Sequence, residues 1–107
     1  MLRKKEFIRR LSDDCRFRHR HLRLKNKIFQ FTLQLEILHR NKWHPVVRYD
    51  TAHGFAHKDI IHYDNSIDKT PVFCLDYTDA LTFAEADLIA NWRLYKNMFI
   101  EEVNSND

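Results

Sequence analysis

Glycine and proline are almost missing from this chain, which has one glycine and two prolines in 107 residues. Phosphate-binding loops need several glycines in a short span, and the nucleophile elbow of serine hydrolases is built around two. The composition therefore gives no support to nucleotide-dependent or serine-hydrolase chemistry. The single glycine, Gly54, is expected where the backbone needs an angle that other residues resist.

Cysteines and long apolar runs are equally scarce. Cys15 and Cys74 lie far apart and are interpreted as unpaired thiols in a reducing compartment. No apolar run approaches the roughly 20 residues that cross a bilayer. The basic N-terminus also lacks the apolar stretch of a signal peptide. We therefore expect a cytoplasmic protein with no membrane segment, and a length that suits one domain.

Charge is distributed unevenly along the chain. Residues 1–27 hold eleven Lys/Arg against three acidic residues, a net +8, whereas the remainder carries a net −5. A basic segment on an acidic body favours a polyanionic ligand or an acidic partner, with a solvated surface that aids solubility as the alternative. The candidate nucleic-acid-binding residues are Arg9, Arg10, Arg16, Arg18, Arg20 and Arg23.

The N-terminal part predicts a basic helix or arm. Residues 3–12 fit a short helix with Phe7, Ile8 and Leu11 on one side. Residues 16–27 alternate, and a strand, an extended arm and a frayed helix all stay open there. We divide the chain into a basic N-terminal helix or arm (1–26), a single α+β domain (27–103) and a flexible tail (104–107).

Period-two alternation over residues 27–38 predicts a strand with one buried face. Further strands are expected over residues 43–49, 57–63 and 70–75, joined by tight turns as in a meander. Apolar residues at three- and four-residue spacing predict a helix over residues 78–103. The expected fold class is α+β: a four-stranded antiparallel sheet with a long C-terminal helix packed on one face.

The candidate catalytic residues Arg48, Asp50, His53 and His57 cluster around the glycine. RNA cleavage without a metal needs a base and an acid, and a histidine serves as either near neutral pH. An arginine can neutralise the charge that builds on phosphate oxygens, and an aspartate can orient a histidine.

Two other interpretations of this run stay open. Imidazole and carboxylate are good ligands for first-row metals, with Asp50, His53, His57 and His62 as the set to test. The spacing of these histidines matches no standard zinc signature, so we expect neither a metal nor another cofactor. The run can also be structural, with its histidines bonded to the loop backbone.

Residues 43–59, which read WHPVVRYDTAHGFAHKD, resemble a family of small uncharacterised prokaryotic proteins. The resemblance continues through residues 80–87 and Trp92 and covers roughly residues 28–102. The run Arg48-Tyr49-Asp50-Thr51-Ala52-His53-Gly54 with His57 is more distantly similar to the Arg-aromatic-Asp-Asn-Ala-His core of TumE-type toxins of toxin–antitoxin pairs. Thr51 stands where that core has Asn. The first resemblance implies a compact α+β domain, and the second implies action on RNA.

These observations predict a toxin-like protein that acts on RNA, with a metal-independent ribonuclease as its most specific form. A cognate antitoxin protein would then be a partner, and a homodimer is left open. The alternative is a non-enzymatic nucleic-acid-binding or adaptor module in which the histidine loop is structural. Convergence of His53, His57 and Arg48 in an open cleft would favour the enzyme, and their burial would favour the module.

Overall fold

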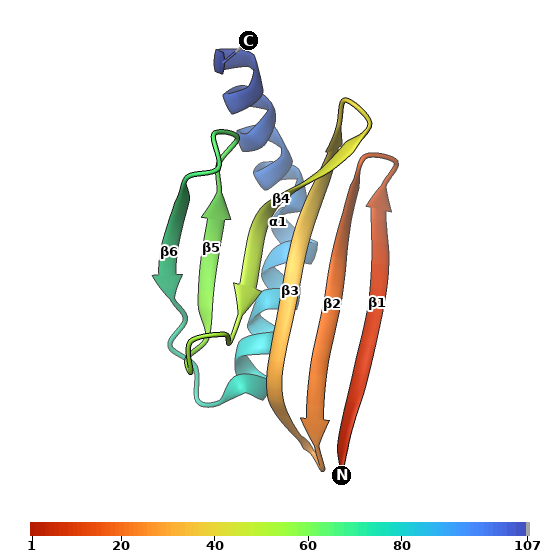
Figure 1. Cartoon of the computed structure of the whole chain (residues 1–107), viewed down its shortest axis with the longest axis vertical. Coiled ribbons are helices and arrows are strands. Elements are labelled where there is room, and N and C mark those ends of the chain that lie inside the picture. The colour runs from red at the N-terminus through yellow and green to blue at the C-terminus, as the bar shows by residue number, and fades with distance from the viewer. Residues whose placement is uncertain (107) are drawn as a thin grey trace.

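The chain forms one six-stranded antiparallel sheet followed by one long helix, in a computed structural model that describes residues 1–106 (Figure 1). The strands follow one another across the sheet in sequence order. No helix among the described residues is long and apolar enough to cross a membrane. The elements are β1 (Leu2–Ser12), β2 (Cys15–Leu24), β3 (Lys27–His39), β4 (Lys42–Asp50), β5 (His57–Ile61), β6 (Ile67–Pro71) and α1 (Tyr77–Asn106).

The α+β class is confirmed, but the expected four-stranded sheet with an N-terminal helix or arm is wrong. Residues 2–12 and 15–24 form two further strands, β1 and β2, paired in register with each other and with β3. Phe7 and Ile8 lie on opposite faces of β1 instead of one side of a helix. A strand here satisfies the outer backbone groups of β2, which a helix could not do.

Helix α1 covers one face of the sheet and packs mainly on β3 and β4. Leu33, Leu35 and Ile37 point towards it and are fully buried, as their alternation predicts. Residues at three- and four-residue spacing meet them from the helix. The buried helix residues are Ala80, Leu81, Ala84, Leu88, Tyr95, Phe99 and Val103. The helix continues through residues 104–106, the beginning of the expected tail, and Asp107 lies outside the described residues.

Two β-bulges interrupt the alternation and change which side chains reach the core. A register shift in the pairing of β3 with β4 makes Val46 an extra residue, so Trp43 lies on the face away from α1. A second register shift, in the pairing of β2 with β3, makes Phe29 an extra residue without a partner on β2. Phe29 is 56% exposed, whereas its neighbour Ile28 is buried.

Asp87, a residue of α1, connects the helix to the sheet through its carboxylate. The hydroxyls of Tyr49 on β4 and Tyr95 on α1 both donate to Asp87 Oδ2, at 2.5 and 2.7 Å. Asn91 donates to Asp87 Oδ1, and Lys58 Nζ on β5 donates to the Tyr95 hydroxyl. Burial acts to raise the pKa of Asp87, but the hydrogen bonds outweigh it and hold that pKa below its usual value.

Replacing Leu33 with alanine should lower the free energy of unfolding by about 2–5 kcal/mol, because it opens a cavity in a fully buried site. The matched control is Leu94→Ala on the outer side of α1, where the side chain is 56% exposed. It should change stability by less than about 0.5 kcal/mol. Urea denaturation of both variants measures the difference, and equal losses would contradict this packing.

Candidate functional site

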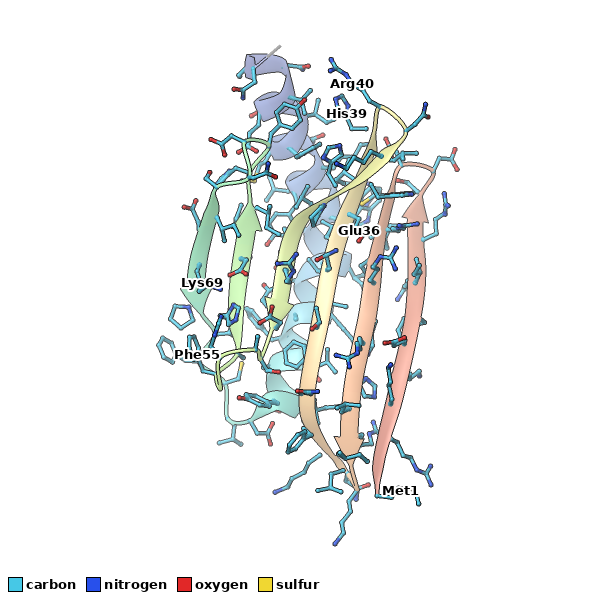
Figure 2. All side chains as sticks on the ribbon, viewed as in Figure 1. Met1, Glu36, His39, Arg40, Phe55 and Lys69 are labelled. Atoms are coloured by element: carbon cyan, nitrogen blue, oxygen red, sulfur yellow. The ribbon has the colours of Figure 1, made fainter. Side chains whose placement is uncertain are left out.

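The face of the sheet turned away from α1, called the open face below, is polar over most of its area. Figure 2 looks onto this face, with Glu36 on β3 and Lys69 on β6 labelled. Cross-strand partners share a face, so the register defines its members. Its polar side chains are Lys4, Glu6, Arg10, Arg16, Arg18, Arg20, Lys27, Gln30, Thr32, Gln34, Glu36, Arg48, Asp50, His57, Asp59 and Lys69.

A buried carboxylate organises the centre of the open face. Glu36 is only 5% exposed, although it lies on the face that no helix covers. It accepts hydrogen bonds from Arg16 Nε at 2.8 Å, Arg18 Nε at 2.9 Å and Gln34 Nε2 at 2.7 Å. A buried charge is tolerated only when it is paired in this way, so Glu36 and its two arginines form one unit.

Two further arginines on this face are also anchored through the Nε atom of their guanidinium groups. Arg20 Nε donates to Glu6 at 3.1 Å, and Arg48 Nε donates to Gln34 Oε1 at 2.8 Å. Within residues 1–106, the hydrogen bonds of all four guanidinium groups use Nε alone. The side chains are thereby held in place, and their terminal Nη groups make no hydrogen bond within this part of the chain.

Trp43, carried onto the open face by the bulge, adds an aromatic surface beside these arginines. The Arg16 guanidinium carbon lies 3.9 Å from the centroid of the Trp43 ring, and that of Arg10 lies 5.6 Å from it. Such cation–π contacts orient a guanidinium without using its N–H groups. A hollow of about 440 Å³ adjoins this region, with Arg18, Arg20, Thr32 and Gln34 among its lining residues.

His57 lies at the β5 end of the open face, enclosed between two carboxylates. Its Nε2 is 2.6 Å from Asp50 Oδ1, a close contact without the alignment of a hydrogen bond. Its Nδ1 lies 3.2 Å from Asp59 Oδ1 and 3.3 Å from Lys69 Nζ. Lys69 also donates to Asp59 at 3.0 Å. The ring is only 1% exposed, so neither nitrogen is presented to a substrate.

The loop between β4 and β5 closes over this histidine. The His53 ring stacks on the His57 ring with centroids 5.6 Å apart, and the Phe55 ring lies 5.5 Å from it. Gly54 has φ of 82°, which confirms the expected left-handed angle. A Cβ on Gly54 would meet no heavy atom within 4 Å, so the angle and not a lack of space explains the glycine.

The structure brings together only part of the predicted catalytic set. Asp50 and His57 are in contact, and His53 packs on them but is itself exposed. Arg48 lies on the same face but is bonded to Gln34. Sequence reasoning missed Asp59, although its position two residues after His57 on one strand could have indicated that the two share a face.

The other missed residues are Glu36, Gln34 and Lys69. The sequence offers no local signal for the first two, because their role depends on arginines from two neighbouring strands. Lys69 reaches the site only through the pairing of β6 with β5.

The predicted nucleic-acid-binding arginines are divided between the two faces. Four of them, Arg10, Arg16, Arg18 and Arg20, lie on the open face. Arg9 and Arg23 lie on the opposite face of the β1–β2 hairpin, since they pair with Phe17 and Ile28. Both are exposed, although Phe17 and His19 on the same face of β2 are buried, and Figure 1 shows β1 lying beyond the helix.

Asp50, His57 and Asp59 offer ligand atoms within 4.8 Å of one another, which is close enough for a metal ion. However, the carboxylates lie against opposite nitrogens of the ring, and an imidazole cannot direct both nitrogens at one ion. The Lys69 ammonium already supplies positive charge beside Asp59. The geometry therefore fits an ion-pair network better than a metal centre.

His62 is separate from this network. Its two nitrogens face Asp68 and Glu102, so it joins the end of β5 to β6 and α1. The hydrogen bonds to Asp68 and Glu102 raise the pKa of His62 above its usual value. A common site for His62 and the loop histidines, as the metal interpretation required, is absent from the described residues.

The chain belongs to a family described as a domain of unknown function (DUF7718), which matches residues 2–105. No curated protein and no solved structure matches it. The family spans all six strands and the helix, so the basic β1–β2 hairpin belongs to the family domain. The match carries no activity, and the similarity to TumE-type toxins stays a prediction.

If His57 is structural, His57→Ala should lower the free energy of unfolding by about 1–3 kcal/mol, because it removes the shared partner of the buried Asp59 and the half-buried Asp50. His53→Ala, at an exposed ring on the same loop, should stay within about 0.5 kcal/mol. Thermal and urea melts measure both. An unchanged melt for His57→Ala would contradict the structural role.

Proposed function

We propose that this protein binds single-stranded RNA along the open face of its sheet. The observation that carries the proposal is the set of four arginines, Arg16, Arg18, Arg20 and Arg48, each anchored through Nε with its Nη groups left over. Ordered guanidinium forks lose little further entropy when they bind, and their planar geometry suits phosphate oxygens.

The spacing of these arginines suits an extended phosphodiester chain. Alternate residues on β2 are about 6.6 Å apart along the strand. Arg16, Arg18 and Arg20 therefore form a regular row on one face. An antiparallel sheet covered by helix on one side and open on the other is also the platform with which RRM domains bind single-stranded RNA.

The choice of RNA as the ligand and the choice of binding over hydrolysis rest on different observations. The similarity of residues 48–57 to the TumE-type core points to RNA as the ligand. Hydrolysis would need a general base with an accessible nitrogen, and both nitrogens of His57 are enclosed. We therefore favour the non-enzymatic nucleic-acid-binding module, which was the alternative in the sequence analysis. Its binding surface is formed by the strands of the sheet.

Arg18→Ala combined with Arg20→Ala should weaken the binding of a fluorescein-labelled oligouridylate by about tenfold or more in fluorescence anisotropy, because two charge-assisted contacts are lost. The slope of log affinity against log salt should fall by about 0.7 for each phosphate contact removed. The control is Lys42→Ala combined with Arg93→Ala, which removes the same amount of positive charge from positions outside the open face. Equal weakening by the two double variants would contradict a binding site on this face.

The second candidate is a metal-independent ribonuclease, the toxin of a toxin–antitoxin pair. The contact of 2.6 Å between Asp50 and His57 favours it, because opening the loop that carries Gly54 would expose an acid–base pair beside Arg48. In that case the protein should cleave mixed RNA in the presence of a chelator, and His57→Ala should abolish cleavage. Intact RNA on the gel, under conditions where anisotropy shows binding, would exclude this candidate.

A further inference from the structure

Strand β1 leaves one side of the sheet without a partner. It is 11 residues long and, within residues 1–106, pairs only with β2, so no strand of this part of the chain lies beside its outer backbone N–H and C=O groups. Residues 2–10 are exposed, and their register with β2 is continuous. A long, regular edge of this kind is a template for a further strand.

The opposite edge of the sheet differs in ways that protect it. Strand β6 has only five residues and ends in Pro71, which has no N–H to donate. In β1 there is no proline or glycine, and its one irregularity lies at its end, between Arg10 and Ser12. The two edges are therefore not equivalent, and only β1 offers a full-length ladder.

The charge on β1 selects what can pair with it. The strand carries Arg3, Lys4, Lys5, Arg9 and Arg10 against a single acidic residue, Glu6. Pairing with a second copy of β1 would place like charges opposite one another on both faces, which is destabilising. An acidic strand would instead meet a lysine or arginine at five of the eleven positions of β1.

Apolar contacts are available on both sides of the same strand. Phe7, on the helix side, is 39% exposed, and Ile8, on the open face, is 49% exposed. The Phe7 ring is held by stacking on His19, with centroids 4.5 Å apart. An added strand with an apolar residue opposite each of them would bury both side chains and fix its own register.

We propose that β1 binds an extended acidic segment of a partner protein, which adds a seventh strand to the sheet. The backbone edge supplies hydrogen bonds, and the basic side chains supply the preference for an acidic sequence. This interaction uses the outer side of β1 and does not depend on RNA binding by the open face.

The test uses a synthetic 11-residue peptide of glutamate and threonine with two adjacent valines at its centre, so that it matches the length of β1 and its valines can lie opposite Phe7 and Ile8. Binding is followed by fluorescence anisotropy, and amide hydrogen exchange of the full chain locates it. Exchange should slow in β1 and not in β6. The same peptide with an N-methyl group on every residue keeps the charge but has no backbone N–H to donate from either edge, so it should bind at least about tenfold more weakly.

Charge reversal in the protein provides the second arm. Lys5→Glu with Arg9→Glu should abolish peptide binding, whereas Lys42→Glu with Arg93→Glu should leave it within about twofold. Circular dichroism checks that both variants fold, and a third pair, Lys5→Gln with Arg9→Gln, replaces the first if it does not.

Three results would overturn the proposal. Equal binding of the N-methylated peptide would show a charge effect without strand addition. Slow exchange of the outer β1 amides in the protein alone, together with a dimer in sedimentation analysis, would show that a second copy covers the edge. Protection of β1 by oligouridylate but not by the peptide would assign the edge to nucleic acid.

Discussion

In the part of the chain that the structure describes, a single helix lies on a six-stranded sheet and covers only one of its faces, mainly over β3 and β4. The distribution of apolar and polar side chains over the sheet depends on this one-sided cover. The covered face is apolar and follows the alternation of β3, while the uncovered face must satisfy its own polar groups. Strand β1 lies beyond the reach of the helix and is exposed on both sides, so it can carry charge on both.

Three carboxylates, of which Glu36 and Asp59 are buried and Asp87 is half-buried, organise the two faces of the sheet. Asp87 joins the helix to β4, Glu36 holds the arginines of the open face, and Asp59 holds His57 and Lys69. Each accepts hydrogen bonds from several donors, as a carboxylate removed from water requires. Leaving any one of them without its donors would expose the full desolvation penalty of a buried charge. The arginines are therefore ordered by structural necessity, and this order makes them suitable for phosphate.

The sequence was most informative where one period persists over a long segment. The alternation of residues 31–37 and the stripe of α1 place most of the core correctly. In β1, apolar residues are too few to distinguish a strand from a helix, and the pairing with β2 decides. Bulges at Phe29 and Val46 are invisible to periodicity because each adds one residue without a change in composition.

In the candidate site, too, some features could be predicted from the sequence and others depend on how the strands pair. The proximity of Asp50 and His57 could be predicted from their density around Gly54, whereas their burial could not. Burial comes from stacking by His53 and Phe55 and from a salt bridge contributed by β6, two strand connections away from β4. A local pattern of acid, histidine and arginine thus identifies a polar cluster but not its accessibility, on which the choice between catalysis and structure depends.

The central claim is that RNA meets arginine side chains anchored through Nε on the open face. The most direct test is a titration of isotope-labelled protein with oligouridylate, observed through the arginine Nε–Hε resonances and the backbone amides. The account predicts that the Nε–Hε signals of Arg16, Arg18, Arg20 and Arg48 shift together, with small changes on the outer surface of α1. Shifts confined to residues 51–57 or to α1, with these four signals unmoved, would contradict it.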